Sequence, residues 1–437
     1  MPDHSAAPFA DLHYDRAGRR PDPTLRLAIM MFLEFAVWGC WAVPISLHMQ
    51  NLKFSGTQTS AIYLTTAIGA MLSPLIAGWI ADRLMPNQLF TGIVHLLGAG
   101  LMLVAWKQVE FAPLWYTMLA YAVLYMPTIA LTNAIAFHHL RDAKSFGKVR
   151  VGGTIGWVAI SFSFSGYLLW WESKTPGVSH VGDCLVAVAI LSVLMGIYCF
   201  SLPNTPPAKR AKNPYAFLEA LKLTSKSNFS VLLIISFLVA IELPFYYNFT
   251  GQFLTDKRSG VGLSESEATA AMTIGQAAEV VLMFLLAPAL RKFGMRNTVL
   301  LGILAWPVRY SIFAIGHPAW LIVAAQALHG ICYSFFFVGG MIAVERLCQK
   351  DIRASAQGLL VFATNGLGML IGSLFSGWVI DRFTTDGVRN WSLFFVIPIA
   401  VTTIAALAFA LLFNERRFKE DAQQIEAQDL ALQGAAV

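Results

Sequence analysis

Ionisable side chains inside long apolar segments are the residues of this sequence that are most able to bind a solute or exchange a proton. An ionised group at the centre of a membrane-spanning helix costs roughly 2.5–3.5 kcal/mol on insertion scales, so it needs a partner, a water-filled cavity or a function. The residues of this kind are Glu34, His95, Glu242, Glu279, Arg309 and His329. They indicate a polar cavity, and the alternative is structural pairing, for example of Arg309 with a carboxylate.

Gln276 and Glu279 form the most informative pair. They are three residues apart in the small and apolar run TIGQAAEVVLM and therefore share one face of a helix. An amide beside a carboxylate can bind a pair of hydroxyl groups, and a low dielectric favours the protonated carboxyl. Glu279 is thus the first candidate for proton exchange, and Glu34, beside Trp38 and Trp41, is the second. Two polar groups on one face can instead hold helices together.

Two further segments place polar and aromatic residues on one helical face. Arg150, Thr154 and Trp157 follow i, i+4, i+7 spacing in VRVGGTIGW. His329 and Tyr333 are four apart in HGICYSFFF. We expect these residues to line the cavity, with helix packing as the alternative.

The segment from Glu242 to Asn248 combines a carboxylate, Pro244, Tyr247 and an amide near the middle of an apolar run. Helices interrupted near the membrane midplane are typical of substrate sites in transporters. Aromatic residues in membrane helices more often belong to the core or to belts at the membrane surface, but Tyr247 is central in its run.

These residues depend on the elements that hold them, and the composition identifies those elements. Of the 437 residues, 57% are hydrophobic and 13% are charged, whereas soluble domains carry about 25% charged residues. This excludes a soluble enzyme, a disordered chain and a nucleic-acid binder. The fold expected is an all-α integral membrane protein in the lipid bilayer.

Twelve apolar runs are long enough to span a bilayer, which takes about 20 residues. We expect a tail at 1–24, a first six-helix bundle at 25–202, a polar Pro- and Lys-rich linker at 203–228, a second six-helix bundle at 229–413 and a tail at 414–437. The expected spans are 25–49, 59–82, 89–106, 113–138, 152–171, 183–202, 229–255, 267–290, 297–316, 319–345, 355–380 and 391–413.

The basic residues predict the orientation. With both termini inside, the cytoplasmic face takes 23 of the 31 Lys and Arg residues and the opposite face takes 7, with Arg309 inside a span. Positive residues accumulate on the cytoplasmic side, so both termini are expected there. The polar first 24 residues hold no apolar signal-peptide core, and we expect no cleavable signal.

A short motif recurs with opposite orientation. Gly78-Trp-Ile-Ala-Asp82-Arg83 ends the second run, and Gly377-Trp-Val-Ile-Asp-Arg382 ends the eleventh. In the predicted topology the first copy is inside and the second outside, as inverted repeats in a transporter would place them; the alternative is chance. No nucleotide-binding G-x-x-x-x-G-K-[ST] motif occurs, so uphill transport would need an ion gradient.

Cysteine and histidine patterns give no reason to expect a metal or a cofactor. The five cysteines form no C-x-x-C pair, and His138-His139 has no carboxylate or thiol at ligand spacing. No HExxH, GxSxG or paired intramembrane Asp signature of an enzyme is present. We therefore expect a protein that is not an enzyme and that uses neither a metal nor a cofactor.

Several motifs together resemble a known family. The loop of Gly78, Asp82 and Arg83 resembles the cytoplasmic gating motif of the major facilitator superfamily. In chain order, five motifs resemble the bacterial nucleoside:proton symporter family, and most closely its YegT-like branch, from about residue 25 to 413. They are Trp38-Gly-Cys-Trp41, Tyr125-Met-Pro-Thr-Ile-Ala-Leu-Thr-Asn133, Arg150-Val-Gly-Gly-Thr-Ile-Gly156, Gln276-x-x-Glu279, and Arg353-Ala-Ser-Ala-Gln-Gly358 with Asn365-Gly366.

The resemblance implies a proton-driven nucleoside importer of the bacterial cytoplasmic (inner) membrane that works by alternating access. We further expect a monomer. The positions it carries over for substrate are Arg150, Thr154, Gln276 and Glu279, with His329 and Tyr333 at its tenth-span aromatic positions. This chain departs from the family's pattern in two places. Pro244 and Tyr247 replace an amide pair, with Asn248 one residue displaced, and Ser334 replaces an Asp.

Three alternatives remain open at this stage. The first is a symporter or facilitator for another small hydroxylated solute, such as a sugar. The second is a transporter-like sensor, which usually needs an output domain larger than tails of about 24 residues allow. The third is an intramembrane enzyme.

Overall fold

The computed structural model describes residues 23–83, 85–140, 143–206, 221–349 and 352–434. Nearly all of the regular structure in these ranges is helical. The N-terminal helices are α1 (Thr24–Ala42), α2 (Pro44–Asn51), α3 (Gly56–Arg83), α4 (Asn87–Trp106), α5 (Phe111–His139), α6 (Ala143–Lys174), η1 (Val181–Asp183) and α7 (Cys184–Cys199). The remaining elements are η2 (Leu223–Ser225), α9 (Ser227–Thr255), α10 (Glu265–Ile315), α11 (Ala319–Ala325), α12 (Leu328–Ile331), η3 (Cys332–Val338), α13 (Gly339–Arg346), α14 (Arg353–Val361), η4 (Phe362–Gly368), α15 (Met369–Arg382), β1 (Thr384–Thr385), β2 (Val388–Arg389), α16 (Trp391–Leu412) and α17 (Glu415–Gly434).

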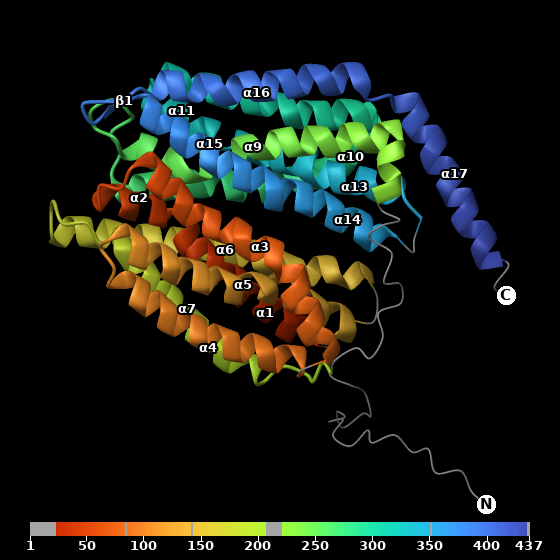
Figure 1. Ribbon diagram of the computed structural model, residues 1–437, viewed down its shortest axis with the longest axis horizontal. Coiled ribbons are helices and arrows are strands. Elements are labelled where there is room, and N and C mark those ends of the chain that lie inside the picture. Colours follow the sequence, from red (N-terminus) through yellow and green to blue (C-terminus); the bar gives the residue numbers. More distant parts are fainter. Residues whose placement is uncertain (1–22, 84, 141–142, 207–220, 350–351, 435–437) are drawn as a thin grey trace, which may run out of the picture.

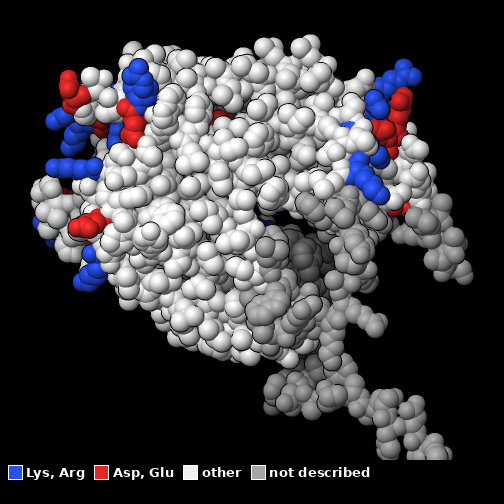
Figure 2. All heavy atoms as spheres, in the orientation of Figure 1, with Lys and Arg blue, Asp and Glu red and all other residues white. Residues whose placement is uncertain are grey.

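The long helices are apolar over lengths that match a bilayer. Among the described residues, ten helical segments are long and apolar enough to cross a membrane. Figure 2 shows charged side chains gathered at the two ends of the molecule, with an uncharged belt between them. In lipid an α-helix satisfies its own backbone hydrogen bonds, which explains why these segments are helical. The expectation of an all-helical, multi-pass membrane protein is confirmed.

The helices form two packed groups. The N-terminal group, from α1 to α7, encloses two hydrophobic clusters around residues such as Trp41 and Met30. The C-terminal group, from α9 to α16, encloses a third cluster that includes Phe249 and Trp306. Figure 1 shows the two groups as two layers. They meet where α3 packs against α15 and where α6 packs against α10.

Helix interruptions fall at recognisable residues. The first apolar run breaks at Val43, and α2 starts with Pro44, because a proline is tolerated in the first turn of a helix but interrupts its interior. α10 joins the runs expected at 267–290 and 297–316, but its backbone is non-helical at Gly294 (φ 79°, ψ 177°). Glycine adopts this backbone conformation at little cost because it has no Cβ. The segments η3 and η4 are π-helical turns, a form that often occurs at functional sites.

The residues after 414 contain a helix that the sequence analysis did not assign. Glu415 in α17 accepts hydrogen bonds from the backbone N–H groups of Met295 (3.2 Å) and Arg296 (2.7 Å), next to the break in α10. Phe418 and Ile425 of α17 are buried. Most of the expected tail at 1–24 and of the linker at 203–228 lies outside the described residues.

Candidate functional site

Glu34 lies inside the N-terminal group rather than in the space between the groups. Its carboxylate contacts Nε2 of His95 at 3.0 Å and accepts a hydrogen bond from Oγ1 of Thr128 at 2.7 Å. The hydroxyl of Tyr125 donates to the Glu34 carbonyl oxygen at 2.7 Å. Glu34 is fully buried, and His95 is nearly so. The second carboxylate candidate is therefore held by polar contacts with α4 and α5.

Arg309 is the centre of a polar cluster in the C-terminal group. It is fully buried, and its Nη1 lies 3.2 Å from Nδ1 of His329. The guanidinium carbon lies 4.1 Å from the ring centroid of Tyr246, whose hydroxyl donates to Oε1 of Gln326 at 3.0 Å. The sequence suggested that Arg309 would pair with a carboxylate. Among the described residues no ion pair joins it to one, and its partners are an imidazole and aromatic faces.

Glu242 is the carboxylate that acts electrostatically on Arg309. It is fully buried and accepts a hydrogen bond from the hydroxyl of Tyr310. Arg309 and Glu242 influence each other electrostatically without a direct ion pair. Glu242 thus belongs to the interior of the C-terminal group.

His329 joins the Arg309 cluster to the residues predicted for substrate. Its Nε2 lies 3.3 Å from the Gln276 amide nitrogen and 3.5 Å from the Tyr247 hydroxyl oxygen. Tyr333 follows on η3 with its ring centroid 6.3 Å from that of His329. The structure therefore brings Gln276, Tyr247, His329 and Tyr333 together from α9, α10, α12 and η3.

Glu279 and Arg150 bring opposite charges together from the two groups. Glu279 lies one turn beyond Gln276 on α10 and is half-buried, as is Arg150 on α6. Arg150 is the charged residue with an electrostatic effect on Glu279, and both act on Tyr333. The Arg150 guanidinium also lies 4.0 Å from the ring centroid of Phe35 on α1. A carboxylate and a guanidinium thus lie on two helices, α10 and α6, that pack against each other between the groups.

The remaining predicted binding residues lie in different surroundings. Thr154 is half-buried one turn beyond Arg150. Trp157 packs edge-on against Trp38 of α1, with ring centroids 5.5 Å apart. Asn248 is buried and donates to Oγ of Ser60 on α3 at 3.4 Å, away from the contacts of His329. The side chains of Asp82 and Arg83, like the surroundings of Gly78, lie outside the described residues.

Carboxylates tie the two groups together at one end of the molecule. Asp381 of α15 accepts hydrogen bonds from the backbone N–H groups of Gly56 (2.6 Å) and Thr57 (2.8 Å) at the start of α3. Reciprocally, Glu172 of α6 accepts from the backbone N–H (3.0 Å) and hydroxyl (2.6 Å) of Ser266 at the start of α10. Each group therefore supplies a carboxylate to a helix N-terminus of the other, where the helix dipole favours negative charge.

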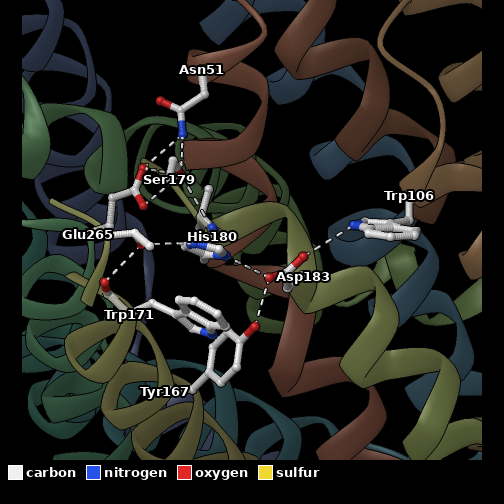
Figure 3. Close-up of polar contacts among 10 residues, drawn as sticks. Asn51, Trp106, Tyr167, Trp171, Ser179, His180, Asp183 and Glu265 are labelled. Carbon is white, nitrogen blue, oxygen red and sulfur yellow. Dashed lines mark hydrogen bonds and ion pairs between the residues drawn. The ribbon is translucent and has the colours of Figure 1, made fainter. Parts of the chain in front are cut away.

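A third tie is built from the loop between α6 and α7 (Figure 3). The hydroxyl of Ser179 donates to Glu265 of α10 at 2.8 Å, and Asn51 of α2 donates to the same carboxylate at 2.8 Å. Asp183 anchors the loop by accepting from the hydroxyl of Tyr167 (2.7 Å) and by contacting Nδ1 of His180 (3.2 Å). All three ties lie at the end of the molecule that carries α2 and β1 (Figure 1).

Two residues of the central cluster could not be assigned from spacing alone. Gln326 is fully buried and bonded to Tyr246, and its only sequence signal is an amide three residues before His329 in an apolar run. Arg309 lies inside an apolar run, so its burial can be predicted from the sequence. Its contact with His329 joins α10 to α12, and residue spacing within one helix does not predict a contact between two helices.

Comparison with known proteins gives consistent matches along most of the chain. The model of the nucleoside H⁺ symporter family matches residues 22–417. The protein YegT of Escherichia coli is 34% identical over 426 residues, which are 94% of this chain and 98% of YegT. The nucleoside permease NupG of Escherichia coli is 28% identical over 90% of this chain and 97% of its own. The xanthosine permease of the same organism is 28% identical, with 92% and 98% covered.

Solved structures give the same picture of the fold. The crystal structure of the nucleoside transporter NupG superposes with a TM-score of 0.78 at 27% identity, covering 90% of this chain and 99% of NupG. A bacterial homolog of the human lysosomal transporter Spinster, in an inward-facing and unoccupied conformation, has a TM-score of 0.70 at 18% identity. It covers 92% of this chain and 99% of the homolog and supports the fold alone.

Proposed function

The chain belongs to the nucleoside H⁺ symporter family, a family of transporters and not of enzymes, and we propose that it imports nucleosides together with protons across the bacterial inner membrane. The observation that supports this proposal most is the contact of Gln276 with His329, one turn from Glu279, on the helix that packs against α6, which carries Arg150. These residues combine amide, carboxylate, imidazole and guanidinium groups in one region, which suits a solute with several hydroxyls and a polar base.

The proposed architecture is twelve membrane spans in two six-helix bundles at 25–202 and 229–413. Ten described helices are long and apolar enough to span, the 28-residue α3 adds another, and the break at Gly294 divides α10 into two. We place both termini in the cytoplasm because of the Lys and Arg distribution. α1 begins and α17 ends at the same end of the molecule, which agrees with this orientation (Figure 1). The protein would work as a monomer in the lipid bilayer.

In this orientation the three carboxylate ties lie on the periplasmic side. They would hold that side closed, so the structure corresponds to a carrier open toward the cytoplasm. Import then requires a second state in which the contacts of Asp381, Glu172 and Glu265 are broken. Gly78, Asp82 and Arg83 would form the corresponding gate at the cytoplasmic side.

The substrate contacts follow from the chemistry of each side chain. Gln276 and Glu279, one turn apart, would bind the ribose hydroxyls with an amide and a carboxylate. Tyr247, His329 and Tyr333 offer aromatic faces and polar atoms for the base. Arg150 and Thr154 would complete the site from α6, with Trp157 as its apolar wall and Asn248 at its periplasmic edge.

Glu279 is the proposed carrier of the coupled proton. When ionised, it attracts Arg150 in the opposite bundle, and protonation removes this attraction. Proton uptake from the periplasm and release to the cytoplasm would therefore alter the balance between the two states of the carrier. Glu34 is the second candidate, since its contact with His95 can also hold a proton.

An uptake competition experiment tests the proposed substrate. Labelled uridine and adenosine are offered to a bacterial strain that lacks its own nucleoside carriers and expresses this protein. We expect saturable uptake that unlabelled nucleosides suppress and sugars do not. Suppression by sugars with no uptake of nucleosides would assign the protein to another hydroxylated solute.

The proposed cytoplasmic gate has its own test. Asp82→Asn should slow uptake strongly and leave nucleoside binding intact, because the residue would stabilise one state of the cycle and not the substrate. Transport by Asp82→Asn at the parental rate would remove Asp82 from the gate.

A further inference from the structure

We propose that Arg309 is a positioning residue, which fixes the tautomer of His329 and thereby the hydrogen-bonding direction of Gln276 in the substrate site. This inference rests on the proposed function only where it links the orientation of Gln276 to nucleoside binding. The tautomer itself follows from the contacts between Arg309, His329 and Gln276 and can be measured without substrate.

Arg309 can only donate a hydrogen bond to His329 and cannot accept one from it. A guanidinium has five N–H donors and no acceptor, and it does not lose its charge in proteins. Nη1 of Arg309 lies 3.2 Å from Nδ1 of His329, and both side chains are buried. The guanidinium is held in place against the ring of Tyr246, at 4.1 Å, and that ring stacks on His329 at 5.0 Å and 16°. Arg309 therefore cannot turn away from the imidazole without breaking this stack.

The contact determines where His329 carries its proton. Nδ1 must accept from Arg309, so the proton of the neutral imidazole is on Nε2. A second proton, on Nδ1, would place two donors and two positive charges against each other at 3.2 Å in a buried site. His329 is thus the neutral Nε2–H tautomer, with its donor directed at Gln276 and Tyr247.

The Nε2–H donor in turn orients the Gln276 amide. The amide nitrogen of Gln276 lies 3.3 Å from Nε2 of His329, and two N–H donors cannot share such a contact. An Nε2–H imidazole therefore requires the amide to turn by 180°, which brings its oxygen to His329 and directs its NH₂ group into the substrate region. One turn away, the Glu279 carboxylate supplies an acceptor, so the site presents a fixed donor beside a fixed acceptor. Without Arg309 the Gln276 amide could bind in either direction.

The other ionisable groups around His329 do not compete for this role. Tyr246 and Tyr247 face it from α9, Tyr333 faces it from η3, and Arg309 faces it from α10. Tyr246 directs its hydroxyl to Gln326, and Tyr247 contacts the same Nε2 atom as Gln276. Among the described residues, Arg309 alone contacts Nδ1.

Nitrogen NMR of the full-length protein with ¹⁵N-labelled histidine tests the tautomer directly. The His329 signals are assigned by their loss in His329→Gln, and spectra are compared between pH 6 and pH 8. We expect an Nε2–H neutral imidazole that does not titrate in this range. An Nδ1–H tautomer or an imidazolium at His329 in the parent protein would overturn the proposal, whatever the variants do.

Substitution of Arg309 tests its role in positioning. Arg309→Met removes the donor while keeping an unbranched buried side chain, and Arg309→Lys keeps a charged donor. Arg291→Met is the matched control, because Arg291 is exposed, lies in the part of α10 before the break at Gly294 and is outside the site. We expect the Nδ1–H form of His329 to become populated in Arg309→Met and to be absent in Arg309→Lys and Arg291→Met. An unchanged tautomer in folded Arg309→Met would contradict the proposal. If Arg309→Met does not fold, the Arg309→Lys spectrum decides, since an Nδ1–H form there would also contradict it.

Nucleoside binding supplies the second measurement. Loss of one correctly directed hydrogen bond corresponds to about 3- to 10-fold weaker binding. We expect this loss for uridine in Arg309→Met and partial recovery in Arg309→Lys. A tautomer as expected with no uridine binding by any variant or by the parent would refute the proposed substrate and leave the positioning role intact. Parental uridine affinity in an Arg309→Met protein whose tautomer has changed would show that Gln276 does not need this orientation.

Discussion

Asp381→Asn should weaken the closure of the end that carries α2 and β1. Asp381 reaches from α15 to the start of α3, where its two carboxylate oxygens accept from the backbone N–H groups of Gly56 and Thr57. Asparagine has nearly the same shape, but it has one acceptor oxygen instead of two and carries no charge. Of these two backbone hydrogen bonds the variant keeps one and loses the other, and it removes the attraction between a negative charge and the helix N-terminus. The Thr57 hydroxyl, which donates to Asp381 at 2.5 Å, can instead accept from the asparagine NH₂ group.

The size of the effect follows from these contacts. Hydrogen bonds to charged groups contribute about 1.5–3 kcal/mol, and neutral ones about 0.5–1.5 kcal/mol. At the low end of both ranges, two charged hydrogen bonds of about 1.5 kcal/mol each are replaced by one neutral bond of about 0.5 kcal/mol, a loss of about 2.5 kcal/mol. Because the contact is partly exposed, solvent screening reduces this loss to about 1–2 kcal/mol. A change of 1.4 kcal/mol is tenfold in an equilibrium constant. The fraction of molecules open at this end should thus rise about 5- to 30-fold.

A cysteine reporter can measure this opening. Ser60 is 1% exposed, and its hydroxyl lies 3.5 Å from that of Ser376, between α3 and α15. Because the five native cysteines are all buried, a Ser60→Cys reporter should dominate labelling by a membrane-impermeant maleimide. We expect faster labelling with Asp381→Asn and no change with the matched control Asp386→Asn, which lies at the exposed turn between β1 and β2. Equal labelling rates with and without Asp381→Asn would refute the reasoning.

Three further predictions concern other carboxylates. Glu279→Gln keeps the shape and hydrogen bonding of the side chain but cannot titrate, so nucleoside binding should persist while gradient-driven accumulation is lost. If the variant still accumulates nucleoside with the parental pH profile, Glu34 rather than Glu279 carries the proton. Glu34→Ala leaves buried partners unpaired and should lower the free energy of unfolding by about 1–3 kcal/mol. Thermal unfolding in detergent measures this loss against Glu34→Gln, and equal stability of the two variants would contradict the prediction. Burial opposes ionisation of Asp256, but hydrogen bonds from the Trp391 indole and from its own loop hold the pKa of this carboxyl below its ordinary value. The contribution of Asp256 to stability is present above pH 3.8, its ordinary pKa, and is lost as the pH falls through the lowered pKa. Asp256→Asn should therefore reduce the pH dependence of unfolding in acid. An unchanged pH dependence would contradict this role of Asp256.

The sequence predicts most of the helices because a bilayer requires long apolar segments. The runs expected at 113–138 and 391–413 correspond to α5 (Phe111–His139) and α16 (Trp391–Leu412). The proline at position 44 also indicates the break between α1 and α2. Hydropathy does not reveal α17, because this helix is polar and is held by side chains such as Glu415 and Phe418 rather than by lipid.

The candidate site is only partly visible in the sequence. Spacing placed Gln276 beside Glu279, since both are on one helix, and it marked His329 and Tyr333 as neighbours. Spacing could not show that Glu34 contacts His95, because α1 and α4 meet only through packing. The same reason hides the contact of Arg309 with His329, which depends on how two parts of the C-terminal group pack together.

Uptake into proteoliposomes tests proton-coupled nucleoside import most directly. The purified protein is reconstituted, the lumen is made alkaline relative to the outside, and accumulation of labelled uridine is followed with and without a protonophore. We predict that uridine accumulates above its external concentration and that its entry accelerates acidification of the lumen. The protonophore, which collapses the pH gradient by itself, should abolish the accumulation. Uridine uptake that stops at equal concentrations and ignores the pH gradient would contradict proton coupling, and the absence of any uridine uptake would contradict nucleoside transport itself.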